Sequence, residues 1–219
     1  LLFLYIIGIL VSLFARINKN LKQIESERDK TALVYLKSQM NPHFLFNTFN
    51  SIYGLGEKEK ADNTANGMLK LSGMLRYVLT DTQSDFVSLS KEIDYINNYI
   101  ELQKLRIEAD TIILYHVEGN YSHHVIAPML LIPFIENAFK YGINPGKKSN
   151  IDIQIKIEDA YLLLQVKNKI IVHNSNSEKM GIGIENTKNR LELLYPIKYT
   201  LTLHETPTDY EVYLKIKLI

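Results

Sequence analysis

The chain has 219 residues, which gives room for one or two domains with cores of their own. Hydrophobic residues make up 46% and charged residues 22%, a composition typical of folded proteins that excludes a disordered chain. The net charge of +1 provides no basic surface for nucleic acid, and the absence of cysteine excludes disulfides and thiolate metal sites.

The first fifteen residues carry no charge and are followed closely by Arg16, Lys19 and Lys22. Residue 1 is Leu, so we expect a fragment of a longer protein. The apolar stretch is shorter than the ~20 residues of a spanning helix, so we interpret residues 1–15 as the end of a transmembrane helix. The basic flank then predicts that the rest of the chain is cytoplasmic. A core helix of a soluble domain is the alternative.

Residues 16–84 are expected to form a linker helix and a helical hairpin. One series of apolar residues with heptad-like spacing begins after residue 16 and is interrupted, and a second series follows in a different phase. Such a phase shift is typical of a helix that enters a dimeric bundle. After a break at 56–63, a further helical stripe follows. Two such helices form an antiparallel hairpin, and two hairpins pair into a four-helix bundle. The three apolar sets are Ile17, Leu21 and Ile24; Leu33, Leu36, Met40 and Phe44; and Met68, Leu71, Leu75 and Leu79.

A histidine behind a proline interrupts the first of these helices, in the sequence Asn41-Pro42-His43-Phe44-Leu45-Phe46-Asn47. Proline has no backbone N–H and crowds the preceding turn, so it opens or kinks the helix. Imidazole is neutral and nucleophilic near pH 7. A lone histidine here would be interpreted as a packed or solvated side chain, so the case for chemistry depends on further motifs.

The second motif lies on a predicted helix that begins at Pro128. Glu136, Asn137 and Lys140 have the spacing i, i+1 and i+4, so one helix end presents a carboxylate, an amide oxygen and an ammonium group. An oxygen ligand suits Mg²⁺ and a lysine suits phosphate. The helix is expected to stop at Tyr141-Gly142. The alternative is an ordinary amphipathic helix with a solvated Glu–Lys pair.

The third motif is glycine-rich and leads into a predicted helix at 184–194. Gly181 and Gly183 allow a close backbone approach, and the free N–H groups of the following helix suit an anion. Asn186 follows three residues after Gly183. By itself a Gly-x-Gly sequence is weak support, but three motifs in a fixed order strengthen one another.

The remainder of the chain, residues 85–219, alternates strands and helices. A helix opens at Ser88 or Ser90, and strands are predicted wherever apolar residues alternate with polar ones. The pattern predicts an α+β sandwich, with a loop at 169–180. The helix stripe is Ile93, Ile96, Ile100 and Leu105, and the strands are 111–117, 151–157, 161–166, 199–204 and 210–216.

These motifs resemble those of LytS-type sensor histidine kinases of bacterial two-component systems. The segment Asn41–Asn47 is similar to the acceptor motif of that family, and Glu136–Gly142 is similar to the N box of the GHKL superfamily. Gly181–Leu194 is similar to the glycine box, which here ends in Leu194-Tyr195-Pro196. The resemblance covers residues 30–219. It implies a dimerising hairpin followed by an ATP-binding sandwich of GHKL (Bergerat) type.

The resemblance implies that the phosphoryl group of Mg-ATP passes to His43 and then to an aspartate in a response regulator receiver domain. It also implies a homodimer held in the inner membrane through its N-terminal helix, with this fragment on the cytoplasmic side. No nucleic acid partner is expected. Asn137 would hold Mg²⁺, and the other implied ATP-binding residues are Lys140, Tyr141, Asn168, Gly181, Gly183 and Asn186.

Three further residues bear on the proposed chemistry. Glu136 could accept a proton from His43. Asn47, at i+4 from His43, could orient a water against the phosphorylated regulator, or satisfy the backbone that Pro42 opens. Asn168 stands where the superfamily carries an adenine-binding Asp, and the glycines that usually follow are absent.

That departure keeps open an alternative: a degenerate kinase acting as a non-catalytic dimeric membrane signalling scaffold. An ATPase of the gyrase and chaperone type is disfavoured, because such proteins need no Asn-Pro-His helix.

Overall fold

The computed structural model describes residue 16 and residues 42–107, 111–143, 148–170 and 182–218. The chain divides into two compact units, Leu1–Ser51 and Ile52–Ile219, and most of the described residues belong to the second. The predicted membrane segment 1–15 and nearly all of the predicted linker helix before Pro42 lie outside the described residues. Within the described chain, no helix is both long and apolar enough to cross a lipid bilayer.

Two helices joined by a short turn come first: α2 (Pro42–Lys58) and α3 (Asp62–Thr80). In the turn, Lys60 takes a left-handed conformation with φ 57°, and the N–H of Ala61 donates to the carbonyl of Gly56 at 2.8 Å. A residue with a left-handed backbone conformation, together with a hydrogen bond back to the last helical turn, is a common way for a helix to end. The two predicted helices and their short link are therefore observed, while the four-helix bundle with a second chain stays a prediction.

A polar stretch follows α3, and it contains the 3-10 turn η1 (Asp81–Gln83). The short strand β1 (Val87–Ser88) then pairs antiparallel with β3 (Val125–Ile126), and neither strand was predicted. Helix α4 (Leu89–Lys104) begins directly after β1. Ser88 occupies its N-cap position, but the serine side chain makes no capping hydrogen bond.

The main sheet has five strands in the order β2-β4-β5-β7-β6. All neighbours are antiparallel except β2 and β4, which run parallel. Each of the five predicted alternating segments forms a strand, because period-two apolar residues can bury one face of a pleated sheet. The strands are β2 (Thr111–Glu118), β4 (Ser149–Glu158), β5 (Tyr161–Lys169), β6 (Tyr199–Glu205) and β7 (Asp209–Lys217).

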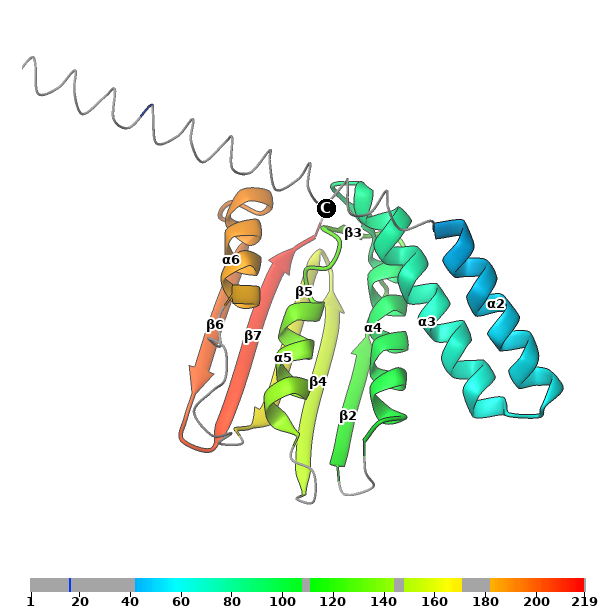
Figure 1. The fold of residues 1–219 in the computed structure, drawn as a ribbon. Helices are drawn as coiled ribbons and strands as arrows, with labels where there is room; N and C mark the ends of the chain where they lie inside the picture. The colour runs from blue at the N-terminus through cyan, green and yellow to red at the C-terminus, as the bar shows by residue number, and fades with distance from the viewer. Residues whose placement is uncertain (1–15, 17–41, 108–110, 144–147, 171–181, 219) are drawn as a thin grey trace, which may run out of the picture. The chain divides into compact units, whose positions relative to one another are not determined.

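Three helices cover one face of this sheet: α4, α5 (Ile132–Gly142) and α6 (Ile182–Leu194) (Figure 1). The core lies between the two layers, where the inward residues of the strands meet the apolar sides of the helices. The largest fully buried side chains include Ile96, Phe134, Ile151 and Tyr195. This two-layer arrangement confirms the predicted α+β sandwich.

Two predictions about helix limits were wrong. Helix α5 begins at Ile132 and not at Pro128, because Met129 takes a left-handed conformation with φ 57° that a helix cannot contain. Leu105 was assigned to the buried stripe of α4, but α4 ends at Lys104 and Leu105 is 58% exposed. The rest of that stripe is confirmed, since Ile93, Ile96 and Ile100 are each at most 1% exposed.

Candidate functional site

Helix α5 separates apolar from polar side chains, and this sets the geometry of the candidate site. Its apolar residues, among them Ile135 and Phe139, are buried, and the helix packs on β4 and β5. On the other side Glu136 and Lys140 are exposed and Asn137 is half-buried. The structure therefore brings together the three side chains predicted to share a face.

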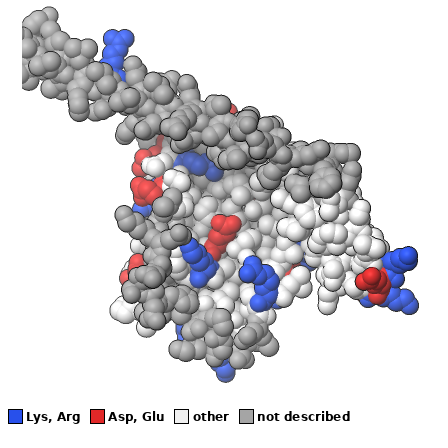
Figure 2. Space-filling view, viewed as in Figure 1, with Lys and Arg blue, Asp and Glu red and all other residues white. Residues whose placement is uncertain are grey.

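None of these three side chains makes a hydrogen bond or an ion pair with another described residue. The surroundings of α5 are charged: Figure 2 shows acidic and basic side chains close together on the helix-covered face of the sheet. The ammonium group of Lys140 lies 5.1 Å from the ring centroid of Tyr141, which is half-buried at the end of the helix. A lysine without a carboxylate partner is available for an anion such as phosphate.

The carboxyl group of Glu136 lies near two tyrosines of α4, the buried Tyr95 and the half-buried Tyr99. Burial first, and then the charge of Glu136, raise the pKa of both Tyr95 and Tyr99 to about 12. Although Glu136 is exposed, neighbouring protein removes part of its hydration and raises the pKa of its carboxyl group. A carboxylate with a raised pKa and no protein partner is suited to accept a proton.

Asn168 lies near the end of β5 and packs against the end of α5. It is only 3% exposed, and its amide nitrogen donates to the carbonyl of Lys169 at 2.9 Å. A Cβ atom at Gly142 would lie 2.7 Å from the Cβ of Asn168, so glycine is required for this close approach. No described donor reaches the amide oxygen of Asn168, which leaves that oxygen as an acceptor.

Helix α6 carries the described part of the glycine-rich motif. Gly183 and Asn186 are exposed, and Gly181 lies outside the described residues. A Cβ atom added at Gly183 would meet nothing within 4 Å. The packing of the described residues therefore does not require this glycine, which is compatible with a requirement for close approach by a ligand.

His43 and Asn47 lie on the described backbone of α2, but their side chains lie outside the described part of the structure. Their predicted roles are therefore not tested by side-chain geometry.

Comparisons with known proteins identify the family. Residues 31–111 match the histidine kinase family model. The chain is 30% identical over 186 residues to the sensor protein LytS of Staphylococcus haemolyticus, covering 78% of this chain and 31% of that protein. It is 27% identical over 182 residues to the sensor histidine kinase YesM of Bacillus subtilis, covering 80% and 31%.

The chain belongs to the histidine kinase family. This confirms the resemblance found from the motifs, and the match includes His43 and Asn47. The chain spans about a third of the length of these two relatives. A solved histidine kinase domain from Erythrobacter litoralis EL346 is similar over 81% of this chain and 94% of that chain, with 8% identity and a TM-score of 0.47.

One buried residue was not predicted from the sequence: Glu92, in the first turn of α4. In the structure Glu92 is fully buried, and its carboxylate accepts hydrogen bonds from Tyr77 and from backbone N–H groups before α5. A signal was present, because Glu92 lies three residues after Leu89 and four before Ile96, on the apolar stripe of its helix.

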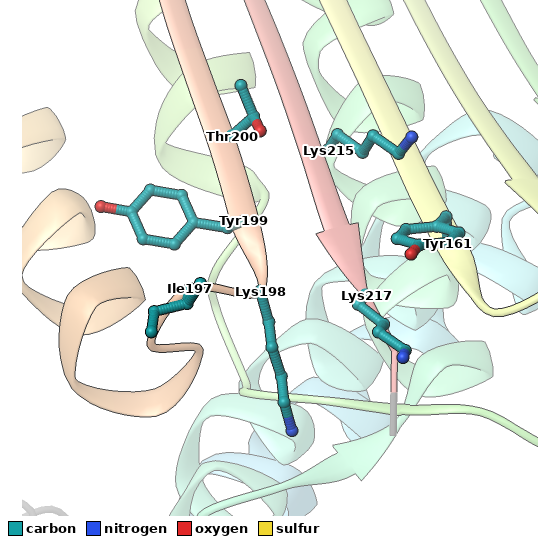
Figure 3. Close-up of a pocket in the computed structure, with 7 residues that line it drawn as sticks. All are labelled: Tyr161, Ile197, Lys198, Tyr199, Thr200, Lys215 and Lys217. Carbon is teal, nitrogen blue, oxygen red and sulfur yellow. The ribbon is translucent and has the colours of Figure 1, made fainter.

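A separate pocket of 430 Å³ lies where β6, β7 and the start of β5 meet (Figure 3). Its lining includes Lys198, Lys215 and Lys217, and none of them has an ion pair within the described chain. The Lys215 ammonium lies 4.5 Å from the ring centroid of Tyr161. None of the predicted site residues lines this pocket, so it is distinct from the α5 site.

Proposed function

We propose that this histidine kinase phosphorylates its own His43 from Mg-ATP and passes the phosphoryl group to an aspartate of a response regulator receiver domain. The observation that carries the proposal is the polar side of α5, where Glu136, Asn137 and Lys140 have no hydrogen-bond or ion-pair partner among the described residues. Family membership supports the same reaction class.

The proposed transfer is a displacement at phosphorus. A ring nitrogen of His43 forms a bond to the γ-phosphorus while the bond to the β–γ bridging oxygen breaks, and ADP leaves with that electron pair. Glu136 accepts the proton that the imidazole gives up, and its raised pKa brings it closer to the operating pH of such a base. Lys140 stabilises charge on the phosphate oxygens, since catalysis of this transfer is mainly positioning and electrostatics.

The proposed magnesium ligand is the amide oxygen of Asn137. The described residues contain no group of three or more His, Cys, Asp or Glu side chains that could hold a metal ion. This fits Mg²⁺, which usually keeps several waters and is bound by one or two protein oxygens together with substrate phosphates. When bound with ATP, the ion neutralises charge on the phosphates.

Around the α5 site we propose the further ATP contacts of Tyr141, Gly181, Gly183 and Asn186, with the acceptor oxygen of Asn168 facing the adenine amino group. A partly buried ring, an exposed glycine and a free amide oxygen are the described features that support these contacts.

We also propose a homodimer formed through the helical hairpin. Leu55 of α2 and Leu69 of α3 are 56% and 57% exposed, which is apolar surface that a second hairpin could bury. Residues 1–15 would anchor the chain in the inner membrane, with the remainder on the cytoplasmic side.

The test of the proposal is transfer of γ-labelled phosphate from ATP to the purified chain. We expect acid-labile label in the wild type and none in His43→Gln, while His116→Gln, on the exposed side of β2, serves as the matched control and labels normally. Label that persists in His43→Gln would overturn the assignment of the acceptor.

Asn47 is proposed to orient water during dephosphorylation of the regulator. Asn47→Ala is expected to keep autophosphorylation and thermal stability and to lengthen the lifetime of the phosphorylated regulator. An unchanged lifetime with a large loss of stability would support the backbone role instead.

The alternative function is a non-catalytic scaffold, and the observation that favours it is Asn168 in place of an acidic residue. A nucleotide titration separates the two functions. A kinase binds ATP, and its affinity falls in Asn168→Leu. A scaffold shows no saturable ATP binding and no label at His43.

A further inference from the structure

Glu92 occupies an unusual position for an acidic side chain. It comes from the first turn of α4, is 0% exposed, and accepts four hydrogen bonds. Backbone N–H groups of Met129, Leu130 and Leu131 donate at 2.9, 3.0 and 3.3 Å, and the hydroxyl of Tyr77 donates the fourth. A carboxylate has about four lone-pair sites, so its acceptor capacity is filled.

These bonds hold the start of α5. Leu131 is the N-cap residue of that helix, and its own side chain provides no capping hydrogen bond. The first N–H groups of a helix lack partners within the helix, and its N-terminus favours negative charge. Glu92 accepts from the N–H groups of Leu131 and of the two residues before it, so it fixes the segment that leads into α5 and places a carboxyl group at the end of the helix that favours negative charge.

Other helices hold the same segment from two more sides. The guanidinium group of Arg190 on α6 donates to the carbonyl of Pro128 at 2.8 Å, and the N–H of Ala127 donates to the hydroxyl of Tyr195 at 2.8 Å. Tyr77 belongs to α3. The entry to α5, which lies between α4 and α6 in Figure 1, is thus bonded to side chains from α4, from α6 and from Tyr195 just after α6, while Tyr77 of α3 is bonded to Glu92.

We propose that Glu92 is a positioning residue for the nucleotide site: it fixes the entry of α5, and through it the placement of Asn137 and Lys140 on that helix. This inference rests on the proposed function, because it concerns the same ATP site. Tyr77 donates the fourth hydrogen bond to Glu92 and so links α3, through Glu92, to the segment that leads into α5.

The proposal is tested by titrating a non-hydrolysable ATP analogue with Mg²⁺ into the full chain and into Glu92→Gln. In the variant an amide N–H group faces the N–H group of Met129 or the Tyr77 hydroxyl, so one anchor bond is lost. We expect the dissociation constant of the folded variant to rise at least tenfold. Ile216→Val, a core truncation on β7, is the stability control and should bind like the wild type.

Tyr77→Phe keeps the ring and removes only the hydroxyl, so it decides the question if Glu92→Gln does not fold. We expect its dissociation constant to rise about threefold, while Tyr95→Phe, which removes a neighbouring hydroxyl not bonded to Glu92, leaves it unchanged. Wild-type affinity in folded Glu92→Gln, or in Tyr77→Phe when the first variant is unfolded, overturns the proposal. Failure of the wild type to bind would instead overturn the proposed function.

Discussion

Two glutamates of the helical layer have carboxyl groups with raised pKa values, yet their surroundings differ. Burial raises the pKa of Glu92, while the hydrogen bonds from Tyr77 and the backbone act in the opposite direction. For Glu136, loss of hydration is the cause and no hydrogen bond opposes it. Glu92 has all its acceptor positions filled by protein, whereas Glu136 has none filled by described residues.

A raised pKa therefore does not by itself distinguish a structural carboxyl group from a reactive one. What separates them is the number of protein donors around the oxygens. A hydrogen bond to a charged group contributes about 1.5–3 kcal/mol, so Glu92 is expected to matter for the position and stability of α5. No described residue donates to the oxygens of Glu136, so within the described structure they are available for a proton or a ligand.

The largest effect is expected from Glu136→Gln. If this carboxylate is the proton acceptor, the variant should autophosphorylate about 10²-fold more slowly, while its free energy of unfolding stays within about 0.5 kcal/mol of the wild type. Because only the ionised form accepts a proton, the wild-type rate should rise with pH through the raised pKa of Glu136. Autophosphorylation rates measured across a range of pH should lack this rise in the variant. A variant with the same pH profile as the wild type would contradict the role of Glu136 as proton acceptor.

A smaller effect is expected from Asn137→Ala on the same helix. Loss of the proposed magnesium ligand should cost about 2 kcal/mol of transition-state stabilisation, which is roughly a 30-fold slower rate. Initial rates with Mg-ATP and denaturation in urea give the two quantities. A wild-type rate in this variant means that the nucleotide site lies elsewhere.

The smallest effect concerns stability at Glu92. Its pKa is raised in the folded state above the value of about 4.3 in the unfolded chain, so the folded state binds more protons between these values. The contribution of this pKa shift to the free energy of unfolding is complete at pH values below the unfolded pKa. It is lost as the pH rises through the folded pKa, and the free energy of unfolding then falls by at most about 1.4 kcal/mol per pH unit. Urea denaturation at several pH values should show this slope in the wild type and not in Glu92→Gln. Parallel pH curves would show that Glu92 does not titrate in this way.

Most elements of the fold could be predicted from the sequence because their signals are local. The alternation of apolar and polar residues over 151–157 predicts a strand without knowledge of its neighbours. In β4 the apolar residues of this segment are buried and the polar residues between them are more exposed. The start of α5 could not be predicted in the same way. It depends on bonds from Glu92, which lies 37–39 positions earlier in the chain.

The features of the candidate site likewise divide into those that follow from local sequence and those that depend on the whole fold. Helical spacing predicts that Glu136 and Lys140, four residues apart, lie on the same side of the helix, and both are exposed, while Asn137 is half-buried. The burial of Asn168 depends on which strand lies next to the end of α5, and that pairing is a property of the whole sheet. No spacing rule applied to a single sequence provides it.

The contact between Gly142 and Asn168 limits which substitutions these two positions tolerate. A side chain at 142 would collide with the amide, and an ionised acid at 168 would lose the N–H that Lys169 accepts. We therefore expect changes at these two positions to be epistatic, because a side chain at 142 requires a smaller residue at 168. Replacing the amide of Asn168 by an acid therefore changes the support of the backbone at Lys169 as well as the chemistry of the side chain.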